Sequence, residues 1–333
     1  MTSRIRVALA AVALIAAAPD DSIDGLRSGL DTAVTVFSLG AVTIGGEAAQ
    51  DMPGGALRFP LTGFLAPRDA AMTVSARQGS SGVWDITTLS FPSAGALGTS
   101  IDHALSYTLG TQAIHGQVDP EFSTASTLEA SLRDLTFERD GAPGTIKQLR
   151  VHATGQPDQG RVEATFDTEF DGLSMAAAGF EGFTPRKVTM RTHGAGLDKE
   201  KLARLLHLAL APDPDREAVR RQLAVLLAVP GTVAELQSLD FDSGPLHGHV
   251  TGRLLPGPSG DVGAELHVTA TGADALLTSL AANPKTRTVL PVAMIARGFG
   301  KVQGQTTVWD IKFSNGVMTV NGSGFGQPPE RKR

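Results

Sequence analysis

The chain contains no cysteine among its 333 residues. This excludes disulfides, thiolate metal ligands, a cysteine nucleophile and a lipid-modified cysteine near the N-terminus. Extracellular domains often depend on disulfides, but a chain of this length can bury enough apolar surface to do without them. The composition therefore favours the periplasm or cell envelope of a bacterium.

A clustered basic surface is also missing from the sequence. The formal net charge is −5, and the densest basic group is Glu330–Arg333, which reads ERKR. Nucleic-acid-binding domains present a basic patch or stripe, so we expect no nucleic-acid partner. We interpret residues 328–333 as a solvated basic tail.

The longest apolar run is too short to cross a bilayer as a helix. Val7–Ala18 follows Arg4 and Arg6 and ends before Pro19, whereas a spanning helix needs about 20 apolar residues. Basic residues followed by a short apolar stretch and small residues are typical of a secretory signal peptide. We expect residues 1–18 to be a signal peptide or a short membrane anchor, and any association with a membrane to use this segment.

Alternating apolar and polar residues between glycine-rich turns predict many antiparallel strands. Leu149–Ala153 and Val162–Phe170 alternate on either side of a turn at Gln156–Gly160. A period of two gives a strand one buried face and one solvated face.

The last predicted hairpin has the clearest turn. Asn315–Gly316 is the residue pair that a type I′ turn prefers. Placing the turn there sets Phe313 opposite Met318 and Ile311 opposite Val320.

Two pairs of helices interrupt the strands. We predict one pair at Asp198–Leu210 and from Asp213 to Pro230, with an aspartate capping each helix and Pro214 in the first turn of the second. The other pair lies in residues 273–297. This order predicts an α+β fold, with a large curled antiparallel sheet of many short strands and two helical hairpins packed on it. We expect residues 19–327 to form a single domain with helical insertions at about 198–229 and 273–297.

Three histidines could meet on one face of a predicted hairpin. If Val250 lies opposite Leu266, then His249 lies opposite His267, and His247 is two residues along the same strand. Alternate residues of a strand project to the same side, so this spacing can chelate a metal ion. The alternative, which we favour, is a solvated polar face.

The predicted helices carry more leucine than a narrow buried stripe requires. One interpretation, which we favour, is a core between the helices and the sheet. The other is an apolar groove suited to an acyl chain. The candidate groove residues are Leu205, Leu223, Leu226, Leu227, Leu276 and Leu280.

Both tryptophans lie in similar stretches, QGSSGVWDI at 78–86 and QGQTTVWDI at 303–311. We predict that Trp84 and Trp309 each lie on the inward face of a strand, because a buried indole removes a large apolar area from water. The second stretch continues into WDIKFSNGVMTVNG, which resembles AsmA-like envelope proteins and related proteobacterial periplasmic β-rich families. That resemblance implies a long curled sheet with an apolar inner groove, associated with lipid handling or upkeep of the envelope. The residues that carry it are Trp309, Phe313, Asn315, Gly316, Val320, Asn321 and Gly322.

No motif assembles a catalytic site. Ser100, Asp102 and His103 are adjacent in sequence, but a catalytic triad is brought together by the fold, and the chain has no G-x-S-x-G elbow. We therefore expect an exported envelope protein that is not an enzyme and has no cofactor. Its role would be binding or structural, toward a lipid or another apolar ligand. The alternatives are a periplasmic hydrolase or metal-binding protein that uses the three histidines, and an assembly factor that binds another envelope protein.

Overall fold

The computed structural model describes most of the chain from residue 42 onward. The described residues are Ile23, Leu26, Arg27, Leu30, Asp31 and Val34, then 42–45, 49–63, 66, 69–80, 82–97, 105–119, 124–139, 142–158, 160–175, 186–209, 215–257, 261–282, 290–314 and 316–325. The predicted leader, Ser100–His103 and Asn315 lie outside them.

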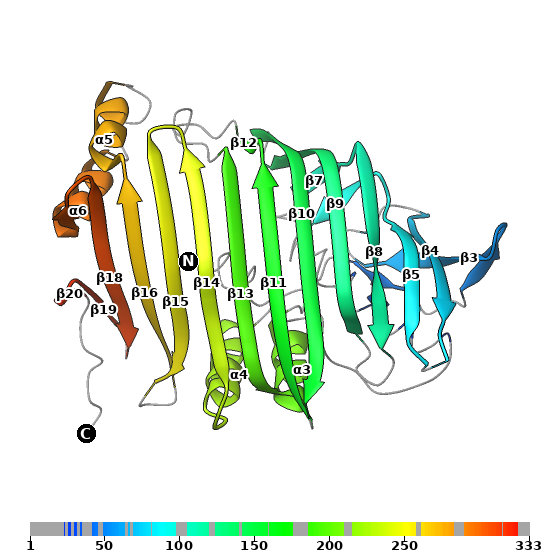
Figure 1. Cartoon of the computed structure of the whole chain (residues 1–333). Coiled ribbons are helices and arrows are strands. Elements are labelled where there is room, and N and C mark those ends of the chain that lie inside the picture. Colours follow the sequence, from blue (N-terminus) through cyan, green and yellow to red (C-terminus); the bar gives the residue numbers. More distant parts are fainter. Residues whose placement is uncertain are drawn as a thin grey trace.

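Antiparallel strands dominate the described residues (Figure 1). In the first half they are β1 (Thr43–Ile44), β2 (Gln50–Met52), β3 (Ala56–Thr62), β4 (Ala71–Gln78), β5 (Trp84–Ser90), β6 (Ala94–Leu97), β7 (Leu105–Thr108), β8 (Thr111–Asp119), β9 (Thr124–Arg139) and β10 (Ala142–Asp158). In the second half they are β11 (Arg161–Asp171), β12 (Ser174–Met175), β13 (Lys187–Asp198), β14 (Val233–Ser243), β15 (Leu246–Pro256), β16 (Val262–Thr271), β17 (Lys301–Gln303), β18 (Thr306–Ser314), β19 (Val317–Val320) and β20 (Ser323–Phe325).

The main strands lie side by side in one broad sheet. Their order is β3-β4-β5-β8-β9-β10-β11-β13-β14-β15-β16-β18-β19. Figure 1 shows this order running from β3 at one side to β18 at the other. We predicted many short strands, but β9 has 16 residues and β10 has 17. The sheet is open and antiparallel. Although few helices accompany it, the predicted α+β class is broadly consistent with the structure.

Hairpin registers test the sequence patterns directly. Phe313 pairs with Met318 and Ile311 with Val320, so the predicted register of the last hairpin is confirmed. The predicted hairpin in β10 and β11 is also confirmed, although Asp158 already pairs with Arg161 and the turn is therefore tighter than Gln156–Gly160.

Among the described residues, four helices connect strands of the sheet. They are α3 (Lys199–Ala209), α4 (Arg216–Leu227), α5 (Ala273–Ala282) and α6 (Leu290–Phe299). Asp198 caps α3 as predicted, since its Oδ1 accepts from the backbone N–H of Lys201 at 3.0 Å. The predicted start of α4 is wrong: Asp215, not Asp213, caps it and accepts from Glu217 and Ala218. No helix among the described residues is long and apolar enough to span a membrane.

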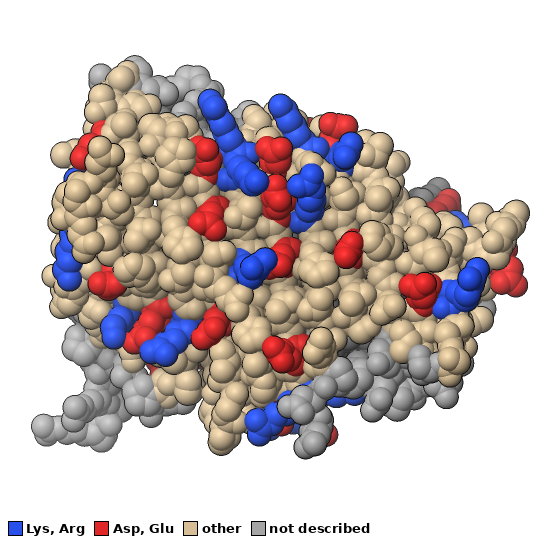
Figure 2. All heavy atoms as spheres, viewed as in Figure 1, with Lys and Arg blue, Asp and Glu red and all other residues tan. Residues whose placement is uncertain are grey.

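The sheet has two chemically different faces because its side chains alternate. We call the face that carries Asp167, Arg191 and His249 the outer face; it is turned toward the viewer in Figures 1 and 2. The inner face is the opposite one, where α3 and α4 pack against β13, β15 and β16.

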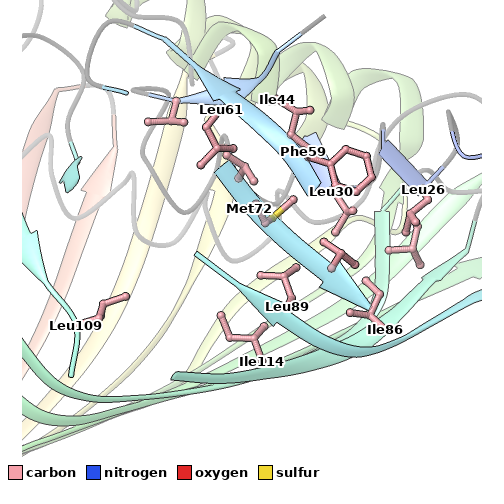
Figure 3. Packing of buried hydrophobic residues seen from close by; sticks show 14 of the residues in the cluster. Leu26, Leu30, Ile44, Phe59, Leu61, Met72, Ile86, Leu89, Leu109 and Ile114 are labelled. Carbon is pink, nitrogen blue, oxygen red and sulfur yellow. The ribbon is translucent and has the colours of Figure 1, made fainter. Parts of the chain in front are cut away.

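The first core cluster lies at the N-terminal side of the sheet (Figure 3). Leu26, Leu30 and Val34 are spaced by four residues, as expected for one face of a helix, and all three are buried. They pack with Phe59 and Met72 from β3 and β4. This helical contribution from the N-terminal region was not predicted.

The second core cluster lies between the sheet and the first helical hairpin. Leu202 and Leu205 from α3 pack with Leu226 from α4 against Val162 and Ala164 of β11. Leu128 of β9 is in contact with both clusters. One continuous sheet therefore supports two separate groups of buried side chains.

Candidate functional site

The leucines proposed for a groove are mainly core residues. Five of the six are buried, and four of those belong to the second core cluster or its close packing. Leu276 on α5 is half-buried. Protein atoms already fill the space around the buried ones, which are Leu205, Leu223, Leu226, Leu227 and Leu280.

A more accessible apolar surface lies on the inner face beyond these leucines. It consists of large apolar side chains on β13 to β19 that are half-buried rather than buried. None of them belongs to the residues of the two core clusters. We call this surface the inner strip, and its members are Val188, Met190, Leu239, Phe241, Val250, Leu266, Val268, Ile311, Phe313 and Met318.

The register of the strands makes the inner strip continuous. Met190 pairs with Leu239, and Leu239 with Val250. Val250 pairs with Val268, which in turn pairs with Trp309. Neighbouring strands lie about 4.8 Å apart, so these side chains contact one another across the sheet. No member of the strip carries a charge, so an apolar group is the partner that this surface favours.

Glycine lets one aromatic ring lie flat on this surface. Gly248 pairs with Phe241 across β15 and β14. A Cβ atom at Gly248 would overlap the ring of Phe241. The ring thus covers the backbone of the next strand, and it widens the apolar surface at this point.

The outer face has the opposite character, with carboxylates paired to bases on adjacent strands (Figure 2). Arg191 of β13 donates to Asp167 of β11 through Nε at 2.7 Å and through a terminal nitrogen at 3.2 Å. Glu169 lies between Lys187 at 3.0 Å and Arg150 at 3.4 Å. Hydrogen bonding to Lys187 is the main reason that the pKa of Glu169 lies below its usual value.

A second carboxylate of the outer face has two cationic partners as well. Glu265 of β16 accepts from Arg253 at 2.7 Å and from Lys312 at 2.9 Å. The hydrogen bond from Lys312 is the largest cause that lowers the pKa of Glu265, and the bond from Arg253 is the next. The carboxylates Glu169 and Glu265 are therefore bound as structural ion pairs, and neither is arranged as a free general acid or base.

The three histidines proposed for metal binding are not brought together in the predicted way. Val250 pairs with Val268 instead of Leu266, so the predicted register is wrong by two residues. His249 lies opposite Thr269, and His267 lies opposite Thr251. The error kept every residue on its predicted face, because a shift by two preserves the alternation.

Each of these histidines has a different carboxylate partner. His249 Nδ1 lies 2.6 Å from Asp240, and His267 Nδ1 lies 2.8 Å from Asp310. His247 Nδ1 lies 3.6 Å from Asp242. Within the described part of the chain, no group of three histidine or acidic side chains is arranged to hold a metal ion.

A shallow hollow of about 510 Å³ opens on the outer face beside His247 and His249. Its floor is the backbone at Phe241, Gly248 and Ala270, and the side chains of Phe241 and Ala270 point to the inner face. Its other lining side chains are Lys187, Thr189, Asp240, Asp242, Thr269, Thr271 and Thr306. The charged groups of this hollow, Lys187 and the two aspartates, each have a partner of opposite charge or a histidine nearby.

Both tryptophans lie on inward positions of their strands. Trp84 is half-buried and packs against the first core cluster, while Asp85 is exposed. Trp309 is also half-buried, and its Nε1 donates to the carbonyl oxygen of Ala296 in α6 at 2.7 Å. The indole of Trp309 therefore joins the last helix to the edge of the inner strip.

Sequence reasoning missed the part of the inner strip that lies on β13 and β14. In β14 the alternation that would reveal it is interrupted, since the register shifts between Leu236 and Leu239. Leu239 and Phe241 thus fall out of phase with Leu236 when the sequence is read with a strict period of two. The signal that could have found them is the continued alternation of Leu239, Phe241 and Ser243 with Asp240 and Asp242.

Comparison with known proteins identifies a family to which most of the chain is similar. Residues 64–329 match the model of a family described as "Uncharacterized protein conserved in bacteria (DUF2125)". The expected likeness to an uncharacterised bacterial family is thus confirmed in this coarser form, while the matched family is not an AsmA family. No curated protein and no solved structure matches the chain.

Proposed function

The chain belongs to a family of uncharacterised proteins conserved in bacteria, and we propose that it is an exported envelope protein that binds the acyl chain of a lipid on its inner strip. The observation that carries the proposal is a row of ten half-buried apolar side chains, free of charge, on an otherwise amphipathic sheet. Soluble proteins rarely leave a large continuous apolar patch exposed unless it binds something.

Two further features support this role. Helices contact the sheet next to the strip, α4 at β15 and β16 and α5 at β15, so they can limit how far a ligand extends. The N-terminal sequence, with Arg4 and Arg6 before Val7–Ala18, supports export. Binding of an acyl chain needs no catalytic group, and the paired carboxylates of the outer face are consistent with that.

The test compares matched substitutions on the two faces of β15. Val250 and Thr251 are adjacent and both half-buried, but Val250 belongs to the inner strip and Thr251 to the outer face. We expect Val250→Asn to weaken binding of a fluorescent apolar probe about tenfold, equivalent to about 1.4 kcal/mol. Thr251→Asn should leave the affinity unchanged. A fatty acid should displace the probe from the wild-type chain.

A second pair guards against a variant that fails to fold. On β16, Val268 belongs to the inner strip and Thr269 to the outer face, so substituting each with asparagine repeats the comparison. Circular dichroism with a thermal melt reports whether each variant folds. Native mass spectrometry of the purified chain should detect co-purified lipid. The proposal would be refuted if the purified chain carries no lipid and if fatty acid does not displace the probe from it. Zinc or copper retained in stoichiometric amount would instead favour a metalloprotein.

A further inference from the structure

The corner formed by α6 and β17 exposes an unusual amount of apolar surface. Met294 and Ile295 on α6 are 58% and 61% exposed, and Val302 on β17 is 58% exposed. These are the highest exposures among the large apolar side chains of the described residues. Apolar groups left in water forgo the stabilisation that burial would give, and their clustering here indicates that the corner meets another surface.

The position of this corner is fixed by the fold. Trp309 Nε1 donates to Ala296 at 2.7 Å, and Asn321 Nδ2 donates to the carbonyl oxygen of Phe299 at 2.7 Å. Gly300 N–H donates to the carbonyl oxygen of Arg297 at 3.1 Å and turns the chain from α6 into β17. These hydrogen bonds to backbone carbonyls of α6 hold the helix that carries Met294 and Ile295 against the edge of the sheet.

The sequence around the corner is basic in a chain that is acidic overall. Between Asp274 and Asp310 there is no acidic residue, but there are four basic ones, in a chain of net charge −5. Arg297 is bonded to Asp274 at 2.8 Å and 3.2 Å. Lys301 is exposed and precedes Val302 on the strand β17, where successive side chains project to opposite faces, so both border this edge of the sheet. The four basic residues are Lys285, Arg287, Arg297 and Lys301.

We propose that this corner, made of Met294, Ile295, Val302 and Lys301, docks on the surface of an anionic phospholipid bilayer. Apolar side chains of an interfacial helix insert into the headgroup region, and nearby basic residues are attracted to anionic lipids. A bilayer satisfies both features of the corner at once. The proposal goes beyond acyl-chain binding on the inner strip and does not require it.

The experiment uses the full chain with Trp84→Phe, which leaves Trp309 as the sole tryptophan. Because the Trp309 indole is bonded to α6, vesicles with brominated acyl chains should quench its fluorescence when the corner docks. We expect quenching with phosphatidylglycerol vesicles, and at least fivefold less with phosphatidylcholine alone. High salt should also weaken it, because exposed charges are screened.

Matched variants assign the contact to the corner. Met294→Ser with Ile295→Ser should reduce vesicle binding at least tenfold, and Lys301→Glu should reduce it by a smaller factor. Val225→Ser is the control, since Val225 is an exposed apolar residue, at 49%, on α4. All four substituted side chains are exposed, so thermal melts should match that of the parent chain.

Outcomes that contradict the proposal are distinct from those that contradict acyl-chain binding. Corner variants that bind vesicles as well as the parent chain would overturn it, and so would quenching that is equal on neutral and anionic lipid. Loss of a dimer in sedimentation, with vesicle binding unchanged, would assign the corner to a second copy of the chain. Displacement of the apolar probe by fatty acid in solution should be the same in corner variants and parent.

Discussion

Asp31 shows how a single buried carboxyl group links the first core cluster to pH. Its Oδ1 accepts from the backbone N–H of Ile44 at 2.6 Å. Burial raises the pKa of Asp31, and this outweighs the lowering effects of that hydrogen bond and of Arg27. A raised pKa means that the folded state holds the neutral form more readily than the unfolded chain does.

The consequence for stability follows from the sign of that shift. The stabilisation from a proton on Asp31 is complete below the pKa of the unfolded carboxyl, about 3.9, and is lost as pH rises through the folded pKa. Asp31→Asn is neutral at every pH and keeps an acceptor for Ile44. We expect this variant to be more stable than the wild type at pH 7 and equally stable near pH 3.5, as measured by urea unfolding. Lower stability at pH 7 would show that the carboxylate charge is favourable.

Leu205 tests whether the leucines of α3 and α4 are core or ligand contacts. Its side chain is 0% exposed, so Leu205→Ala should lower the free energy of unfolding by about 2–5 kcal/mol. Leu276→Ala, at a half-buried position on α5, should cost less. Denaturant unfolding measures both. A variant Leu205→Ala that keeps its stability but loses affinity for the apolar probe would reassign this leucine to the binding site.

At the scale of elements, the capping of α4 rests on one side chain. Asp215 Oδ1 accepts from Glu217 N at 2.9 Å and from Ala218 N at 3.2 Å. We expect Asp215→Ala to destabilise the protein by about 1 kcal/mol and Asp215→Asn, which retains the acceptor, to cost less. Thermal unfolding monitored at 222 nm would detect the difference. Equal losses in both variants would indicate that the charge, and not the hydrogen bonds, is what matters.

Local turn chemistry explains which elements could be predicted. The last hairpin was placed correctly because Asn315–Gly316 allows one tight turn and hence one register. The β15–β16 hairpin was not, because its longer connection after Pro256 sets no register, and a slip of two residues leaves Val250 and His249 on the same faces. The helices α3, α5 and α6 were found from their periodicity and flanking residues.

The candidate sites were harder to predict than the elements. An apolar helix such as α6 is expected to be buried, so the exposure of Met294 and Ile295 could not be read from the sequence. For the inner strip, the sequence indicated an apolar face but not which part of it the helices cover. The sequence pointed to the leucines because they repeat on helices. Most of them are buried in the core between the helices and the sheet, and these helices cover part of the apolar face.

At the scale of the whole molecule, two clusters of buried residues share one sheet. Leu132 of β9 belongs to the first cluster and Ala153 of β10 to the second, and these two strands pair along most of their length. We expect one cooperative unfolding transition in which Leu132→Ala and Leu205→Ala both lower the same midpoint. Far-ultraviolet circular dichroism and tryptophan fluorescence should report coincident transitions. Two separated transitions, each moved by only one of the substitutions, would show that the clusters unfold independently.

The connectivity of the sheet has a consequence for how the chain folds. From β8 to β20, each main strand pairs with the main strand that precedes it in the sequence. The entropy cost of closing a connection grows only slowly with its length, even where a helical hairpin intervenes as between β13 and β14, so each new strand can add to an edge already in place. A chain delivered end first, from a ribosome or a translocation pore, can therefore assemble this sheet progressively, without waiting for its far end to arrive.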